Sequence, residues 1–273
     1  MSKVGRNYFR SGLLAIVLCG VPHASGIEKN ITGSSTTGAS LNPTTHRTAP
    51  LNPQDPPTPI RQPLPADSNL RITCEYRGTG PETNFTGVYH YQLWLPAGFD
   101  AQSAATWKVI FIASPQGHAN LGNMAAWIAA HRYVGVGLEE SKNGPAEPVI
   151  GNFLAAHDDI CRRLHVAEGQ KICTGFSGGA RASSTFVTLR PGFRALILQG
   201  AGCALNLPDG TYDIKNINTP QVSVTMGTQD GNANEITRLR RSFGPRLQVF
   251  EFNGGHQWAP TESIEAALER TLK

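Results

Sequence analysis

The sequence predicts an α/β protein with a mostly parallel sheet and helices on both faces. Two observations carry this prediction. Short apolar runs alternate along the chain with stretches whose apolar residues recur at helical spacing. One such run leads through Gly175–Gly179 (Gly-Phe-Ser-Gly-Gly) into a helix-compatible stretch, which is typical of a sharp strand-to-helix turn. Because right-handed crossovers place strand-to-helix loops at one edge of such a sheet, a ligand site is expected at that edge.

The first part of the chain predicts export. Basic residues at positions 3, 6 and 10 precede an apolar run from about Gly12 to Cys19, and small residues follow up to Gly26. This order is typical of a secretory signal peptide over residues 1–26, and the run is shorter than the about 20 residues that span a bilayer. We therefore expect a secreted protein, extracellular or periplasmic, with no transmembrane segment after signal removal. The alternative is a disordered N-terminus that is never cleaved.

A tether and one folded domain are predicted to follow. Residues 27–67 are rich in Thr, Ser, Pro and Asn and poor in large apolar side chains, so we expect a disordered or partly polyproline tether. Residues 68–273 show no internal repeat and are expected to form a single domain. The net charge of +4 is spread thinly with no block of Lys and Arg, which gives no argument for a nucleic-acid partner.

The elements of this domain can be assigned in order from local patterns. Two aromatic and β-favouring segments flanked by Gly and Pro predict an antiparallel pair of strands, and continuous apolar runs predict strands buried on both faces. Strands are expected over Leu70–Tyr76, Val88–Leu95, Val109–Ala113, Tyr133–Leu138, around Ile172, and over Ala195–Gly200, Gln221–Met226 and Leu247–Phe252. Amphipathic spacing predicts helices over Leu121–His131, Ile150–Leu164, Ala180–Leu189, Glu235–Ser242 and Thr261–Leu272.

The strand-to-helix turn carries a candidate nucleophile. Gly175 and Gly179 flank Ser177 at positions where side chains would clash across a strained turn. A serine hydroxyl is a poor nucleophile at neutral pH and needs a base, which in turn needs a carboxylate to orient it. Asp230 and His256 each follow a later predicted strand, in the order Ser, Asp, His. All three are therefore expected at the same edge of the sheet.

Each of these assignments has an alternative. Asp230 is followed by Gly231 and fits an ordinary turn, and Asp209, in the loop after the preceding strand, is a rival carboxylate. His256 can be read as a loop histidine, although the glycines before it and Trp258 after it disfavour this interpretation.

The turn, the Gly-x-x-Asp loop at Asp230 and the Gly-Gly-His-Gln-Trp loop at His256 resemble the α/β-hydrolase superfamily. Within it, the resemblance is to the secreted esterase branch of polyhydroxybutyrate-depolymerase, feruloyl-esterase and dienelactone-hydrolase-like proteins. It implies an α/β-hydrolase fold over the folded part, with Ser177 as nucleophile, His256 as general base and acid, and Asp230 as orienting carboxylate. The resemblance implies hydrolysis of a small-molecule or polymeric ester, with no metal or organic cofactor. Dienelactone hydrolases carry a cysteine nucleophile, so the serine favours ordinary ester hydrolysis.

An oxyanion hole is also expected from this resemblance. Its first donor is predicted to be the Gly178 backbone N–H, directly after the nucleophile. The second comes from the loop after the Val109–Ala113 strand, which often begins His-Gly in relatives but here reads Ser114–His118 (Ser-Pro-Gln-Gly-His). Because Pro115 has no N–H, we predict Gln116 as the second donor.

Neighbouring residues receive weaker predictions. Trp258, Phe176 and His118 are candidates for substrate contacts, with a place in the core (for the aromatics) or on the surface (for His118) as the alternative. Two acidic residues at positions 139 and 140 end a strand at the same edge and suggest a solvated rim, and Arg181 is expected to form a structural ion pair.

The cysteines predict disulfides without fixing their pairing. Cys74, Cys161, Cys173 and Cys203 remain after signal removal, and four cysteines in an exported chain allow three pairings. Buried free thiols are the alternative.

Two rival functions also fit the sequence. The first is a peptidase of the same fold, which is disfavoured because no propeller or cap domain is found. The second is a non-catalytic binding protein held by the tether. The segment between the strands at Gly200 and Gln221 is short, so we expect no large lid and a rather open cleft.

Overall fold

An eight-stranded sheet organises the described part of the chain, residues 69–100 and 106–273 of the computed structural model. The strand order is β1-β2-β4-β3-β5-β6-β7-β8. Pairing is antiparallel between β1 and β2 and between β2 and β4, and parallel in all the other pairs. The predicted α/β class with a mostly parallel sheet is confirmed. The predicted signal peptide and tether lie outside the described residues.

The strands and helices occupy most of the predicted segments. The strands are β1 (Asn69–Tyr76), β2 (Gly87–Trp94), β3 (Trp107–Ala113), β4 (Tyr133–Leu138), β5 (Val166–Phe176), β6 (Phe193–Gln199), β7 (Gln221–Gly227) and β8 (Leu247–Phe252). The α-helices are α1 (Ala125–Ala130), α2 (Ala146–Arg163), α3 (Gly178–Leu189), α4 (Glu235–Phe243) and α5 (Thr261–Arg270). Short 3-10 helices cover η1 (Gly80–Phe85), η2 (Gly122–Met124) and η3 (Gly244–Arg246).

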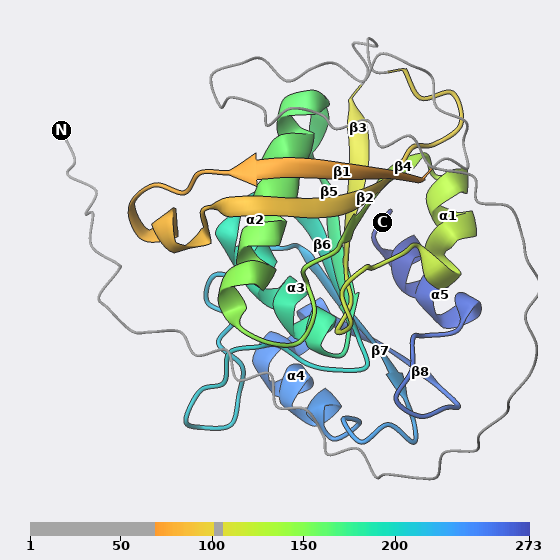
Figure 1. Ribbon diagram of the computed structural model, residues 1–273. Coiled ribbons are helices and arrows are strands. Elements are labelled where there is room, and N and C mark those ends of the chain that lie inside the picture. The colour runs from red at the N-terminus through yellow and green to blue at the C-terminus, as the bar shows by residue number, and fades with distance from the viewer. Residues whose placement is uncertain (1–68, 101–105) are drawn as a thin grey trace, which may run out of the picture.

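Helices cover both faces of the sheet. In Figure 1, α2 and α3 lie on one side of it and α1 and α5 on the other. The larger core, on the side of α2, α3 and α4, contains Phe153, Phe186 and Leu239, whereas Trp127 and Leu268 belong to the smaller core beneath α1 and α5. These side chains are almost fully removed from water. Burying each of them contributes about 1.5–3 kcal/mol, so the two cores fix the sheet between its helical layers.

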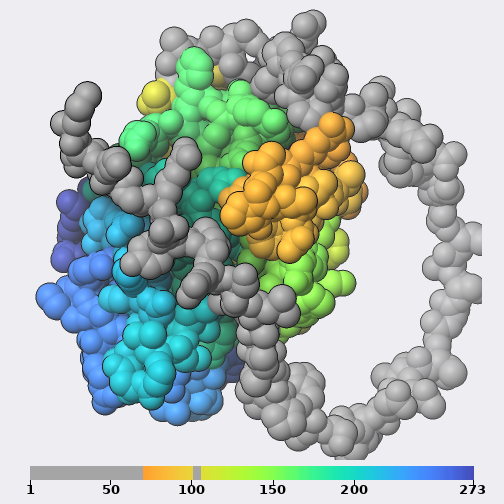
Figure 2. Space-filling view, turned by 90° about the vertical axis from the view of Figure 1, so that its left-hand side faces the viewer, coloured from red at the N-terminus to blue at the C-terminus, as the bar shows by residue number. Residues whose placement is uncertain are grey.

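The two edges of the sheet are formed by the first and last strands. Figure 2 shows the β1 and β2 segment (orange) at one side of the molecule and the segments beyond residue 200 (cyan and blue) at the other. The parallel register aligns Ala113 with Gly175 and Phe176 with Gln199. The loops after β3, β5 and β6 therefore begin side by side at the carboxyl edge.

Two predicted helices have different bounds in the structure. The helix predicted over Leu121–His131 is shortened to α1, because Gly122 has φ +49° and begins the 3-10 turn η2. Helix α2 begins at Ala146 rather than Ile150, directly after Pro145. Pro145 is the N-cap residue with an extended ψ of 145°, and Pro148 lies in the first turn, where a missing N–H costs no helical hydrogen bond.

No large lid lies over the carboxyl edge in the described residues. The segment between β6 and β7 contains one isolated bridge, between Asn206 and Tyr212, and no helix. Among the residues that the structure describes, no helix is both long and apolar enough to cross a membrane.

Candidate active site

The turn between β5 and α3 holds Ser177 in a strained conformation. Its backbone has φ 53° and ψ −117°, and a non-glycine residue at positive φ costs about 1–3 kcal/mol. The flanking glycines make this turn possible. A Cβ on Gly175 would lie 2.4 Å from the Gly179 carbonyl oxygen, and one on Gly179 would lie 2.3 Å from that of Ala113. The Ser177 N–H is donated to the Gln199 carbonyl at 2.8 Å, which anchors the turn to β6.

The structure brings Ser177, His256 and Asp230 into one chain of hydrogen bonds. Ser177 Oγ lies 2.9 Å from His256 Nε2, and His256 Nδ1 lies 2.8 Å from Asp230 Oδ2 and 3.0 Å from Oδ1. An ionised carboxylate only accepts, so the proton of a neutral His256 lies on Nδ1 and Nε2 is left to accept the Ser177 hydroxyl proton. This is the arrangement that a serine nucleophile requires.

Asp230 is fixed by its loop as well as by His256. Its side chain is 1% exposed, and Oδ1 also accepts the Asn232 N–H at 2.8 Å. The Asp230 N–H is donated to the Gly227 carbonyl at 3.0 Å, so the turn begins at the last residue of β7. The rival carboxylate Asp209 lies in an exposed turn and accepts the N–H and the hydroxyl of Thr211. It is not brought to His256.

Two of the three candidate substrate residues, His118 and Trp258, line a pocket beside this chain of hydrogen bonds. The pocket has a volume of about 320 Å³ and is lined by Ser114, Gln116, Gly117, His118, Ala119, Asn120 and Trp258. The Phe176 ring is not part of this lining. It packs beneath the catalytic candidates, with its centroid 4.7 Å from that of His256 and 5.2 Å from that of Trp258. Phe176 therefore supports the His256 ring from the buried side.

Two backbone N–H groups of the loop after β3 are donated within that loop. Gln116 N–H is donated to Ser114 Oγ at 3.3 Å, and Gly117 N–H to the Ser114 carbonyl at 3.0 Å. The other predicted donor, Gly178, is the first residue of α3. The first N–H groups of a helix have no partner within the helix, so the Gly178 N–H is available beside Ser177.

Glu139, which directly follows β4, differs from its prediction as part of a solvated rim, whereas Glu140 is partly exposed. The Glu139 side chain is 2% exposed, and its oxygens lie 2.8–3.0 Å from the Arg71 guanidinium and accept a hydrogen bond from Gln92. Burial alone would raise the pKa of Glu139, but the hydrogen bond and charge of Arg71, with smaller effects of Gln92 and His118, together lower that pKa. The carboxylate also lies 3.8 Å from His118 Nδ1, beside the pocket.

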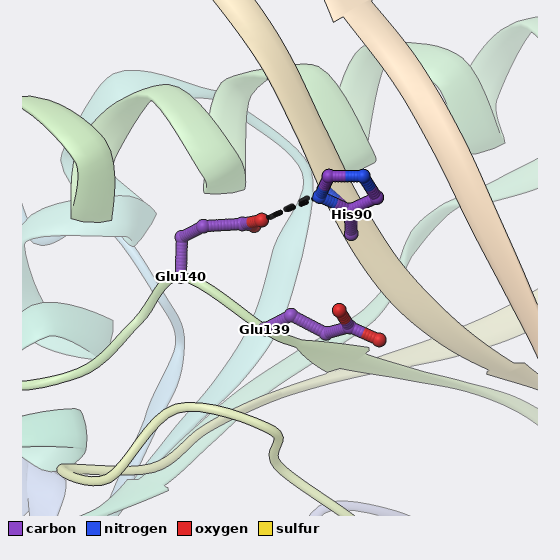
Figure 3. A group of neighbouring side chains, drawn as sticks. All are labelled: His90, Glu139 and Glu140. Atoms are coloured by element: carbon purple, nitrogen blue, oxygen red, sulfur yellow. Dashed lines mark hydrogen bonds and ion pairs between the residues drawn. The ribbon is translucent and has the colours of Figure 1, made fainter.

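Residues of metal-ligand type gather at the same place. One potential ligand atom each from His90, Glu139 and Glu140 lies within 4.8 Å of the others. Figure 3 shows the Glu140 side chain directed at the His90 ring, which it meets at 2.7 Å, whereas the Glu139 carboxylate extends to the side. Because Arg71 already compensates the charge of Glu139, these residues fit an Arg71–Glu139 ion pair and a His90–Glu140 hydrogen bond better than a cation site.

The ion pair predicted for Arg181 is present. Its guanidinium lies 2.5 Å from the Glu235 carboxylate, which also accepts the Gly202 N–H at 2.7 Å and the Tyr212 hydroxyl at 2.6 Å. These contacts join α3, α4 and the loop after β6.

The disulfide prediction is wrong for this structure. Cys74, Cys161, Cys173 and Cys203 are all free thiols. Three of them are buried within the core, and burial raises the pKa of Cys173 and of Cys203 to about 12. The alternative of buried thiols therefore holds for these three.

Comparison with solved structures assigns the fold. The described chain is similar to S-formylglutathione hydrolase from Staphylococcus aureus, with a TM-score of 0.55, 13% identity, and coverage of 76% of this chain and 100% of that one. It is similar to a ferulic acid esterase from Anaeromyces mucronatus (TM-score 0.55, 13% identity, 80% and 93% covered). A dienelactone hydrolase-like promiscuous phosphotriesterase from metagenomic libraries gives a TM-score of 0.55 at 12% identity, with 75% and 96% covered.

No family model and no curated protein matches the sequence. The chain has the α/β-hydrolase fold, and its structural neighbours include esterases of the branch that the sequence resembles. At these identities the likeness establishes the fold, and the activity has to be argued from the site.

Proposed function

We propose that this protein is a secreted serine hydrolase that cleaves carboxylic esters through an acyl-enzyme. The observation that carries the proposal is the pair of hydrogen bonds that runs from Ser177 Oγ through the His256 ring to Asp230. The strained turn at Ser177 adds support, because backbone strain of this kind is characteristic of functional sites.

The reaction would begin with attack of Ser177 Oγ on the ester carbonyl carbon while His256 Nε2 takes the hydroxyl proton. Asp230 would stabilise the resulting imidazolium through Nδ1–H, and the Gly178 N–H would donate to the carbonyl oxygen as it gains charge. Collapse of this intermediate breaks the bond to the alcohol, which leaves with the proton from Nε2. Water, deprotonated by the same nitrogen, then releases the acid and restores the Ser177 hydroxyl.

The openness of the site supports small or polymeric esters over lipid emulsions. The His256 side chain is 41% exposed, and no helix lies between β6 and β7 to cover it. Trp258 and His118 line the adjacent pocket and are proposed to contact the substrate. Bulky or polymeric chains can reach such a cleft without a lid movement.

Hydrolysis of a panel of esters by wild type and Ser177→Ala tests the proposal. We expect wild type to cleave soluble short-acyl and polymeric esters and Ser177→Ala to lose this activity. Hydrolysis of peptide amides with no ester turnover would favour the rival peptidase, and turnover that survives in Ser177→Ala would exclude the mechanism.

Export and tethering are proposed from the sequence alone, with a signal peptide over residues 1–26 and a tether over residues 27–67 before the catalytic domain, 68–273. N-terminal sequencing of the protein recovered outside the cytoplasm tests this organisation. We expect the mature chain to begin directly after Gly26, and a chain that keeps its first residues would contradict it.

A further inference from the structure

The loop after β3 offers no uncommitted backbone N–H for a second oxyanion donor. From Ser114 to Ala119 each backbone N–H in the structure already has an acceptor, and Pro115 has none to donate. The acceptors are Ser141 Oγ for Ser114, Ser114 Oγ for Gln116, and the carbonyls of Ser114, Glu139 and Leu138 for Gly117, His118 and Ala119. A second donor has to come from elsewhere.

The side-chain amide of Asn143 lies directly against Gly178, the residue that follows the nucleophile. A Cβ built on Gly178 would lie 1.7 Å from Asn143 Oδ1, 2.8 Å from Cγ and 3.3 Å from Nδ2. The amide therefore occupies the space where any other residue at position 178 would place its side chain. Only a glycine lets this amide approach the start of α3.

The Asn143 backbone is held in place while its amide stays available. Its N–H is donated to the Pro115 carbonyl at 2.8 Å, which ties the loop after β4 to the loop after β3. No hydrogen bond of its side-chain amide is found among the described residues, and the residue is exposed at the carboxyl edge. Rotation of the amide exchanges Oδ1 and Nδ2 without a change of shape, so Nδ2 can turn towards a charge that develops beside Gly178.

We infer that Asn143 is a catalytic residue whose Nδ2–H donates to the oxyanion, next to the Gly178 N–H. The inference rests on the proposed ester hydrolysis and replaces the predicted second donor, Gln116. Asn143 gives up no proton in this role. It stabilises the charge that the carbonyl oxygen gains when Ser177 attacks, so its effect should appear in kcat more than in KM.

Two different substitutions remove the amide from this place. Asn143→Ala deletes it, and Gly178→Ala displaces it, because the three atoms nearest to the new Cβ all belong to the end of the Asn143 side chain. Gly178→Ala keeps the backbone N–H and favours the helix, so it should fold. Lys142→Ala, on the same loop, is the matched control.

We expect each single variant to lower kcat about 100- to 1000-fold with KM changed less than about threefold. The double variant should be no slower than Asn143→Ala, because both changes remove the same hydrogen bond. Affinity for a boronic acid, which mimics the tetrahedral intermediate, should fall by the same factor, and Lys142→Ala should match wild type.

A kcat of Asn143→Ala within about threefold of wild type would overturn the inference and leave the proposed function standing if Ser177→Ala is inactive. Additive losses in the double variant would also overturn it, because Gly178→Ala would then act by another route. Failure of wild type to cleave any ester would overturn both the proposed function and this inference.

Discussion

The Arg181 guanidinium and the Glu235 carboxylate meet at 2.5 Å and join the helix that follows Ser177 to the helix that follows Asp230. Both side chains are largely buried, and Glu235 also holds the loop after β6 through the Gly202 N–H. The pair therefore ties together the loops that carry the nucleophile and the acid.

Arg181→Met is expected to lower the free energy of unfolding by about 2–3 kcal/mol, because it leaves a buried carboxylate without its charged donor. Urea unfolding curves measure this loss, with Arg241→Ala as control, an exposed arginine on α4, the helix that carries Glu235. A loss in Arg181→Met no larger than in the control would show that the pair is not structural.

Asp230→Asn is expected to lower kcat about 10,000-fold. The amide that replaces the carboxylate can donate to Nδ1 of His256, so the proton of His256 is no longer held on that nitrogen. Asp209→Asn should leave kcat unchanged, since Asp209 accepts hydrogen bonds from Thr211 at a distance from His256. Kinetics of both variants on a soluble ester distinguish the two carboxylates. The opposite pattern would assign the acid to Asp209.

The stability of the fold is expected to fall below pH 6.5 because of His157. Burial, and then the charge of Lys171, lower the pKa of His157 below its ordinary value of 6.5, although Asp158 acts in the opposite direction. The unfolded chain therefore binds a proton more readily at His157 than the folded chain does. The stability that neutral His157 contributes is complete above pH 6.5 and is lost as the pH falls through its folded-state pKa.

His157→Gln should reduce this dependence. The measurement is the urea midpoint of wild type and variant at about pH 7.5 and about pH 5.5, where the other titrating groups contribute alike to both proteins. Equal pH dependence in wild type and His157→Gln would show that His157 does not titrate on unfolding.

All four cysteines after the signal region are expected to be free. Thiol titration of the unfolded, unreduced chain should give four thiols, because the structure pairs none of Cys74, Cys161, Cys173 and Cys203. Reductant should leave the melting temperature unchanged. A titration that finds two thiols or none would show that disulfides form in the native protein.

Much of the carboxyl edge was predictable because its signals are local. The Gly-x-Ser-x-Gly turn and the loops at Asp230 and His256 each follow a recognisable strand, and parallel topology alone brings such loops to one edge. The shortened helix near Gly122 was not predicted, because its apolar spacing is helical while its backbone adopts φ +49°.

Contacts between distant segments could not be read from the sequence. Arg71 and Glu139 are 68 residues apart, and the pair depends on β1 lying next to β2 and β2 next to β4. Asn143 lies in a Lys-Asn-Gly segment that matches no recognisable motif, and no local pattern indicates that its side chain lies against Gly178. The disulfide prediction failed for a similar reason, since cysteine count carries no information on which thiols meet.

The central claim is that Ser177 is a nucleophile activated by His256. Labelling the full chain with a fluorophosphonate and measuring intact mass and peptide masses tests it most directly, because the probe reacts with an activated serine. We predict one adduct per chain, on the peptide that contains Ser177, and no adduct on Ser177→Ala or on His256→Ala. An unlabelled wild type, or an adduct that persists in Ser177→Ala, would contradict the claim.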